Sequence, residues 1–323
     1  MNAHGDYFRG HLRINFGHKP VGNNKISDWL KSPKSSLLLP LTADYPQQFS
    51  SLNALAPHFA YESSLFSSAA LESFETARCK WSNAVDRDGV AWRFIALYYA
   101  AFYAGHAIIR LSGESLTWIN DWTQAQKEFN LYFKTTAIPK LNLQSCYHSA
   151  RLEAVGNIIT VSNCALDSSS GSHKALWSTF HRLALKAYGD NTFSTSQHIQ
   201  ASHEYVRILG GQLNYRSKWD WPWLSPLRNE INYVLPRELW GSSSERILPS
   251  VNKIICSLLK RPTQAEIMKC AGHDSPWVRF SGSCVYMVEL LINLLNRMYS
   301  SSSKASLFPP CYKTFARLLS TDK

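Results

Sequence analysis

The chain has 323 residues, of which 45% are hydrophobic and 13% aromatic. This composition is typical of a globular protein and excludes an intrinsically disordered one. Lys and Arg outnumber Asp and Glu by 34 to 23, which gives a net charge of +11. The sequence contains no long basic run, so a basic tail is excluded and the charge favours a phosphate polymer as partner only modestly.

Cysteine spacing and the N-terminal sequence both bear on the cellular compartment. The seven cysteines are widely spaced and form no CxxC motif, which predicts reduced thiols and not a disulfide framework or a zinc site. The N-terminal sequence MNAHGDYFRGHLRINFGHKP has no apolar signal core. We therefore expect a cytoplasmic protein.

One uncharged run raises the question of a membrane segment. The sequence FIALYYAAFYAGHAII lies between Arg93 and Arg110, and it is shorter than the roughly twenty apolar residues that span a bilayer. We expect a buried core helix and no membrane association. His106, which interrupts the run, is expected to be a hydrogen-bonded core histidine.

Helical periodicity begins only after an N-terminal arm. Residues 1–60 are rich in polar and turn-forming residues, and we expect little regular structure there. A helix is predicted over 62–81, followed by the strongest helix of the chain at Val90–Leu111, which ends at Ser112–Gly113. Its small residues would allow neighbouring helices to approach closely, so we expect this helix at the centre of the core.

The rest of the chain is also expected to be helical. Helices are predicted over 115–134, 145–160, 175–188, 247–260 and 286–299, and a Ser/Gly-rich loop, CALDSSSGSH, interrupts the series. No alternation long enough for a sheet is evident. The predicted fold class is therefore all-α, with an arm over 1–60 and one helical domain over 61–323 that contains an insertion around 164–215.

The segment WDWPWLSPLRNEINYVLPRELW has the most unusual composition in the chain. Ser225 is suited to an N-cap and Pro226 to the first helical position, which predicts a short helix. Aromatic rings mixed with cations precede it. They suit single-stranded RNA or DNA and equally a protein–protein interface. The candidate nucleic-acid-binding residues are Arg216, Lys218, Trp219, Trp221 and Trp223.

Several motifs that would identify an enzyme class are missing from the sequence. It contains no GxxxxGK[ST], GxGxxG, HExxH or GxSxG. This argues against the common classes of NTPase, dehydrogenase, zinc protease and α/β-hydrolase. We therefore expect neither a cofactor nor a metal ion.

Three segments together resemble the HEPN superfamily of helical, nucleotide- and RNA-associated domains. They are IALYYAAFYAGHAIIRLSG, SHKALWSTF and SPLRNEINY, and the resemblance covers about residues 86–240. It implies a HEPN-like helical bundle, commonly a homodimer. HEPN ribonucleases carry an Arg followed four to six residues later by a His, and this pattern would place Arg228, Asn229 and Tyr233 at the catalytic positions.

The residue types of that motif suit RNA cleavage, but this chain departs from it. Arginine holds a phosphate through two parallel hydrogen bonds, and histidine exchanges protons near neutral pH. Tyr233 stands where the family has His, and tyrosine, with an ordinary pKa near 10, is a poor base. A structural role for the cluster, in which Arg228 pairs with Glu230 or a remote carboxylate, is the alternative interpretation.

Two functional hypotheses follow from the resemblance. In the first, the protein is defence- or stress-associated and binds RNA or a nucleotide, with toxin-like, metal-independent RNA cleavage as an additional activity to be tested. In the second, it is a catalytically inactive subunit that docks on a partner protein of the same locus. His148, His173 and His181 contribute to the Arg228 site only if the fold brings them there.

Overall fold

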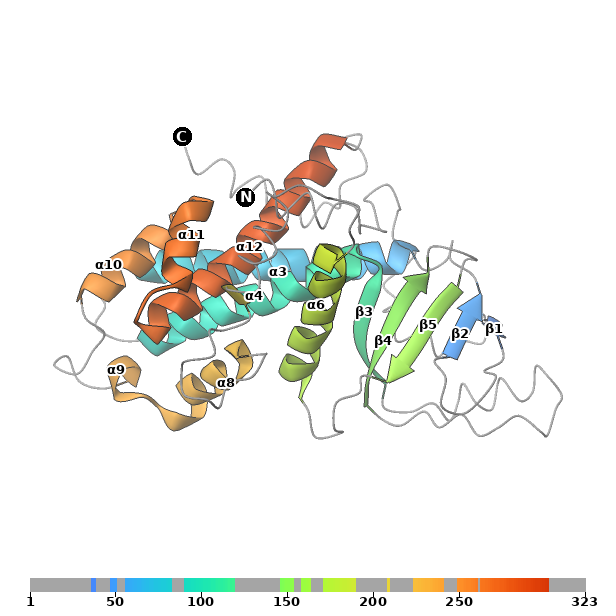
Figure 1. Ribbon diagram of the computed structural model, residues 1–323, viewed down its shortest axis with the longest axis horizontal. Helices are drawn as coiled ribbons and strands as arrows, with labels where there is room; N and C mark the ends of the chain where they lie inside the picture. Colours follow the sequence, from blue (N-terminus) through green and yellow to red (C-terminus); the bar gives the residue numbers. More distant parts are fainter. Residues whose placement is uncertain are drawn as a thin grey trace.

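The computed structural model describes a helical part and a sheet at one end of it (Figure 1). The structure describes the following residues: 36–38, 47–50, 56–82, 90–119, 146–153, 158–163, 171–189, 208–209, 223–240, 249–260 and 262–301. The described residues are predominantly helical. The mainly helical character expected from the sequence is therefore confirmed.

Helix α4 (Val90–Leu111) has the predicted bounds and lies at the centre of the core. It packs along α3 (Ala56–Ser82) and is crossed by α12 (Pro276–Ser301). Its small residues do allow close approach, because a Cβ added to Gly105 would lie 3.3 Å from the Leu176 side chain of α6 (Ser172–Gly189). The uncharged run therefore serves as the central packing element.

By length and composition alone, helices α4 and α12 are both long and apolar enough to cross a membrane. The most apolar window of each is 83% buried inside the protein. Burial of this kind is what a core helix shows, and it agrees with the interpretation of α4 made from its sequence.

The remaining helices surround this centre. Helix α10 (Pro249–Leu258) and α11 (Gln264–Ala271) pack on α12. The segment α8 (Leu224–Asn229), η1 (Glu230–Val234) and α9 (Arg237–Trp240) lies against α4. Helix α8 begins at Leu224, two residues before the predicted first helical residue Pro226. Trp223 occupies the N-cap position and no side chain caps the helix, so the N-cap prediction for Ser225 is wrong.

A five-stranded antiparallel sheet adjoins the helical part, with α6 between them in Figure 1. Its order is β1-β2-β5-β4-β3. The strands are β1 (Ser36–Leu38), β2 (Gln47–Ser50), β3 (Glu114–Ile119), β4 (Cys146–Glu153) and β5 (Ile158–Asn163). Strands β1 and β2 come from the predicted N-terminal arm, which therefore contains more regular structure than expected.

The sheet corrects two helix predictions. The helix predicted over 115–134 begins instead with β3, and the one predicted over 145–160 is replaced by β4 and the start of β5. Residues 114–117 of β3 are all buried, so the strand shows no alternation of apolar and polar residues. Since a strand covered on both faces loses the period of two, its pattern could not be recognised.

Candidate functional site

The segment that carries Arg228 changes from an α-helix to a π-turn immediately after it. Helix α8 ends at Asn229, and the η1 turn closes with a hydrogen bond from the Leu235 N–H to the Glu230 carbonyl, five residues back. In a regular α-helix, Tyr233 would lie about 140° around the axis from Arg228. The wider turn brings both to one side, with the Arg228 guanidinium carbon 5.8 Å from the Tyr233 ring centroid.

The π-turn ends in a strained residue. Leu235 has a φ of 54° and a ψ of 63°, the left-handed conformation that glycine usually adopts at a helix end. For a side chain with a Cβ this conformation costs about 1–2 kcal/mol. Both a π-turn and a strained backbone are typical of functional sites, and here they adjoin the predicted catalytic residues.

Arg228 is held between tyrosine rings. Its Nη2 donates to the Tyr99 hydroxyl of α4 at 2.7 Å, and its Nη1 donates to Asn229 Oδ1 at 3.0 Å. The guanidinium carbon lies 5.6 Å from the Tyr99 ring centroid. These contacts fix the direction of the guanidinium group but do not neutralise its positive charge.

No carboxylate whose side chain the structure describes neutralises Arg228; the side chain of Glu238 lies outside that description. Its hydrogen bonds go to a hydroxyl and an amide oxygen, and the ion pairs found there join other residues. The buried Arg228 Nε has no hydrogen-bond partner. Pairing with Glu230, the structural alternative considered from the sequence, is therefore not observed. A partly buried arginine without a counter-charge lowers the stability of the fold unless a bound anion neutralises its charge.

A histidine joins this cluster from α6. The His173 ring contacts the Tyr99 ring at 6.0 Å and the Phe102 ring at 4.5 Å between centroids. Burial and the positive charge of Arg228 lower the pKa of His173 to about 4. The imidazole is therefore neutral at neutral pH, and an anion placed beside Arg228 would raise its pKa again.

Tyr98 fixes the tautomer of His173. The Trp177 indole N–H donates to the Tyr98 oxygen at 3.1 Å, and the same oxygen lies 2.9 Å from His173 Nδ1. Burial raises the pKa of Tyr98, so its hydroxyl keeps its proton. Since the oxygen already accepts from Trp177, we assign the Tyr98 hydroxyl as the donor to Nδ1. His173 then carries its proton on Nε2, where it is a hydrogen-bond donor.

The position of His173 adds to the positive potential. It lies in the first turn of α6, an 18-residue helix with no acidic residue in that turn. The first N–H groups of a helix carry a partial positive charge that attracts anions. Arg228, whose charge also acts on His173, and the α6 N-terminus therefore both favour a negative group in this neighbourhood.

Only one of the five predicted nucleic-acid-binding residues lies within the described part of the chain. Arg216, Lys218, Trp219 and Trp221 lie outside the described residues. Trp223 is only 7% exposed and packs against Phe280 of α12 at 6.4 Å between ring centroids. The prediction that Trp223 offers a surface for bases is therefore wrong, because the ring fills the core just before α8 begins.

The predicted catalytic residues and the three candidate histidines can also be placed. Arg228 is half-buried, Asn229 is exposed and Tyr233 is 74% exposed. Of the histidines, only His173 adjoins Arg228. His148 is fully buried on β4, and His181 lies two turns further along α6. Sequence reasoning missed Tyr98 and Tyr99, although both belong to the YYAAFYA segment that carries the resemblance.

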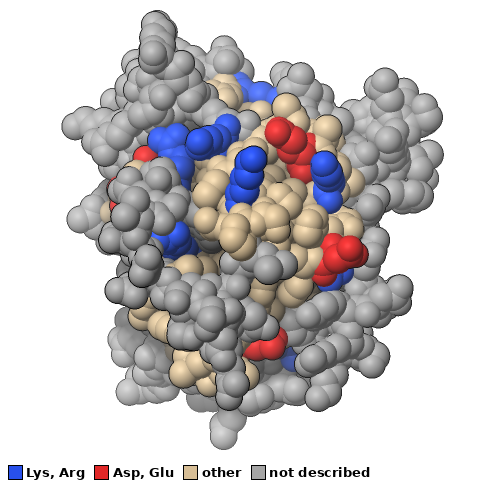
Figure 2. Space-filling view, turned by 90° about the vertical axis from the view of Figure 1, so that its left-hand side faces the viewer, with Lys and Arg blue, Asp and Glu red and all other residues tan. Residues whose placement is uncertain are grey.

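Charge on the adjoining face is dispersed. Figure 2 shows the end of the helical part, where some described Lys and Arg side chains lie near one another at the upper left and others are separated by uncharged and acidic side chains. The net charge of +11 is therefore not concentrated in one continuous patch on the described part of that face. Specific placement of Arg228, and not a broad basic surface, distinguishes the site.

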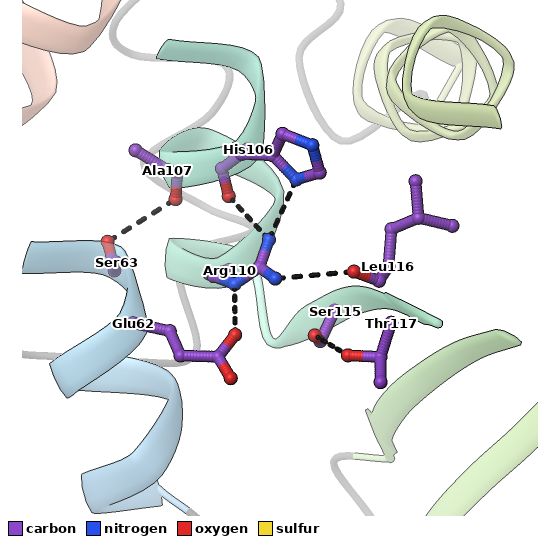
Figure 3. Close-up of polar contacts among 8 residues, drawn as sticks. All are labelled: Glu62, Ser63, His106, Ala107, Arg110, Ser115, Leu116 and Thr117. Carbon is purple, nitrogen blue, oxygen red and sulfur yellow. Dashed lines mark hydrogen bonds and ion pairs between the residues drawn. The ribbon is translucent and has the colours of Figure 1, made fainter. Parts of the chain in front are cut away.

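A second cluster of arginine and histidine lies within the core (Figure 3). Arg110 Nε donates to Glu62 Oε2 at 2.6 Å, and its Nη1 donates to His106 Nδ1 at 3.0 Å. Nη2 donates to the Leu116 carbonyl at 3.3 Å. Arg110 is 3% exposed, Glu62 and His106 are each 6% exposed, and burial together with Arg110 lowers the pKa of His106. This cluster is a closed structural network, as the core-histidine interpretation of His106 expected.

The chain was compared with protein-family models, with curated proteins and with solved structures, and none of the three comparisons gave a match. Among the described residues, no group of three His, Cys, Asp or Glu side chains is placed to hold a metal ion. The arrangement around Arg228 can bind an anion through fixed N–H donors.

Proposed function

We propose that this protein binds a phosphate group of RNA or of a nucleotide at Arg228, with His173 as a second hydrogen-bond donor. The observation that carries the proposal is the half-buried Arg228, which no described carboxylate neutralises. A phosphate oxygen would supply the missing counter-charge and accept from the guanidinium group. The α6 N-terminus beside it favours the same negative group.

Binding is favoured over cleavage by the residues present. With a pKa of about 4, His173 is a weak base at neutral pH, and its Nδ1 is engaged by Tyr98. Tyr233 occupies the position where HEPN ribonucleases have histidine. We therefore propose a HEPN-like, defence- or stress-associated binding protein as the primary function, and toxin-like RNA cleavage as a further activity that the same experiment tests.

The test is the affinity of wild type and Arg228→Ala for a labelled single-stranded RNA, measured by fluorescence anisotropy. Losing charge-assisted hydrogen bonds worth about 1.5–3 kcal/mol should weaken binding about tenfold or more. Counterion release should also decrease, which lowers the slope of log affinity against log salt by about 0.7. Gel electrophoresis of the same samples shows whether the RNA is cleaved.

The matched control is Lys269→Ala. Lys269 is an exposed residue of α11, and its removal also lowers the net charge by one. If charge alone attracted RNA, both variants should weaken binding equally. Equal affinity of Arg228→Ala and wild type, with unchanged circular dichroism, would show that Arg228 is not the phosphate site.

Docking on a partner protein is the second candidate, and exposed aliphatic side chains favour it. Val234 is 69% exposed and Leu235 is 52% exposed beside Tyr233. Exposed apolar groups next to a site often mark protein interfaces. In this case Val234→Ser should weaken co-purification with a partner encoded in the same locus, while RNA affinity stays at the wild-type value.

A further inference from the structure

Exposed aromatic rings gather around the Arg228 site. Within the described part of the chain, the strongly exposed rings beside it are Tyr233 at 74%, Trp92 at 55% and Trp240 at 38%. They come from η1, the first turn of α4 and α9, which pack on one another. Exposure of large rings costs free energy in a folded protein unless a partner covers them.

These rings are held in position. The Trp240 indole N–H donates to the Ile231 carbonyl of η1 at 2.8 Å. Trp92 meets Trp240 edge to face at 5.8 Å between ring centroids. Tyr233 is held beside the Arg228 guanidinium. Rings fixed in this way lose little conformational entropy when a planar ligand stacks on them.

The spacing of these features along α4 indicates the size of the ligand. Tyr99, which orients Arg228, lies seven residues after Trp92, so both lie on the same side of α4 about 10 Å apart. A stacked strand advances about 3.4 Å per nucleotide. A ligand that contacts both Arg228 and the Trp92–Trp240 pair therefore spans several nucleotides, which a mononucleotide does not.

We infer that the ligand of this site is single-stranded nucleic acid, with one phosphate at Arg228 and neighbouring bases stacked on Tyr233 and on the Trp92–Trp240 pair. The inference rests on the proposed function and specifies its ligand class. Aromatic side chains stack on unpaired bases, whose faces a duplex covers. The positive charge of Arg228, which no described carboxylate neutralises, lies between these rings and favours a polyanion with planar groups over an apolar protein surface.

The experiment measures affinity for a labelled oligoadenylate of roughly twelve nucleotides, within the usual range of single-strand site sizes. RNA and DNA versions are compared, and the tighter one is used for the variants. Trp92→Ala and Tyr233→Ala should each weaken binding about fivefold or more, since one stacked base contributes about 1–3 kcal/mol. Tyr233→Phe should retain most of the affinity because it keeps the ring. AMP should compete weakly, and a duplex of the same length should bind more weakly than the single strand.

The matched control is Trp118→Ala. Trp118 is 46% exposed on β3 and contacts Tyr147 of the sheet, so its removal should leave affinity unchanged. If Trp92→Ala and Tyr233→Ala bind like Trp118→Ala while Arg228→Ala is weakened, the stacking inference is wrong and the phosphate site stands. If Arg228→Ala also binds like wild type, the proposed function itself is wrong. Equal binding of duplex and single strand would overturn the single-strand assignment.

Discussion

The Arg110 cluster and the Arg228 cluster each combine an arginine, an aromatic ring and a nearby histidine. Their surroundings differ in one decisive respect. Arg110 lies over the Phe66 ring and is neutralised by Glu62 inside the core. Arg228 lies between two tyrosine rings without a described carboxylate. The first arrangement stabilises the fold, whereas the second leaves a positive charge for a ligand. The completeness of the polar network, and not the residue types, distinguishes the core cluster from the proposed binding site.

The largest effect is expected from breaking the core network. Arg110→Met leaves the buried Glu62 carboxylate without its partner, and removal of one member of a buried ion pair costs about 3–5 kcal/mol. We expect a loss of this size in the free energy of unfolding, measured by urea denaturation. The double variant Glu62→Leu/Arg110→Met, which leaves no unpaired charge, should recover most of it. Recovery of nothing would mean that Arg110 acts through its other contacts.

A smaller loss is expected from Tyr98→Phe, which removes the hydroxyl that links α4 to α6. The Trp177 side chain is fully buried, and its indole N–H then loses its acceptor. An unsatisfied buried donor costs about 1–3 kcal/mol. Urea denaturation should show this loss. Tyr61→Phe, on a half-buried tyrosine of α3, provides a control that changes the same group elsewhere.

Helix α4 and the Arg228 cluster show which features the sequence could predict and which it could not. Helix α4 was predicted with its observed bounds, because its apolar run, small residues and Ser–Gly end are all local features. The resemblance groups Arg228 with Tyr233, but no local sequence pattern predicts the π-turn that brings the two side chains together. His173 reaches the site from α6, more than fifty residues earlier in the chain. Contacts of that kind depend on tertiary packing, which periodicity does not report.

The pH dependence of stability should differ between wild type and a His173 variant. The unfolded pKa of His173 is near 6.5 and the folded pKa is about 4, so the unfolded chain binds more protons between these values. Stability should therefore fall as the pH falls from about 6.5 to about 4, and the His173 contribution is flat below that range. His173→Gln keeps a group that can accept from Tyr98 and does not titrate. Its unfolding free energy should fall less steeply over the same range, and an equal slope would contradict the assignment.

The smallest effect on stability is expected at Arg228. Arg228→Met removes two hydrogen bonds that the charged guanidinium donates to Tyr99 and Asn229. Bonds of this kind are worth up to about 1.5–3 kcal/mol, and less where they are exposed, as the bond to Asn229 is. The same change removes a half-buried charge that has no described carboxylate partner, and this gain offsets the loss. We therefore expect an unfolding free energy within about 1 kcal/mol of wild type, against a loss of several kcal/mol for Arg110→Met. Urea denaturation of the two variants side by side makes the comparison. A loss at Arg228 as large as at Arg110 would mean that an ion pair neutralises Arg228 after all, and the residue would then belong to the fold and not to a binding site.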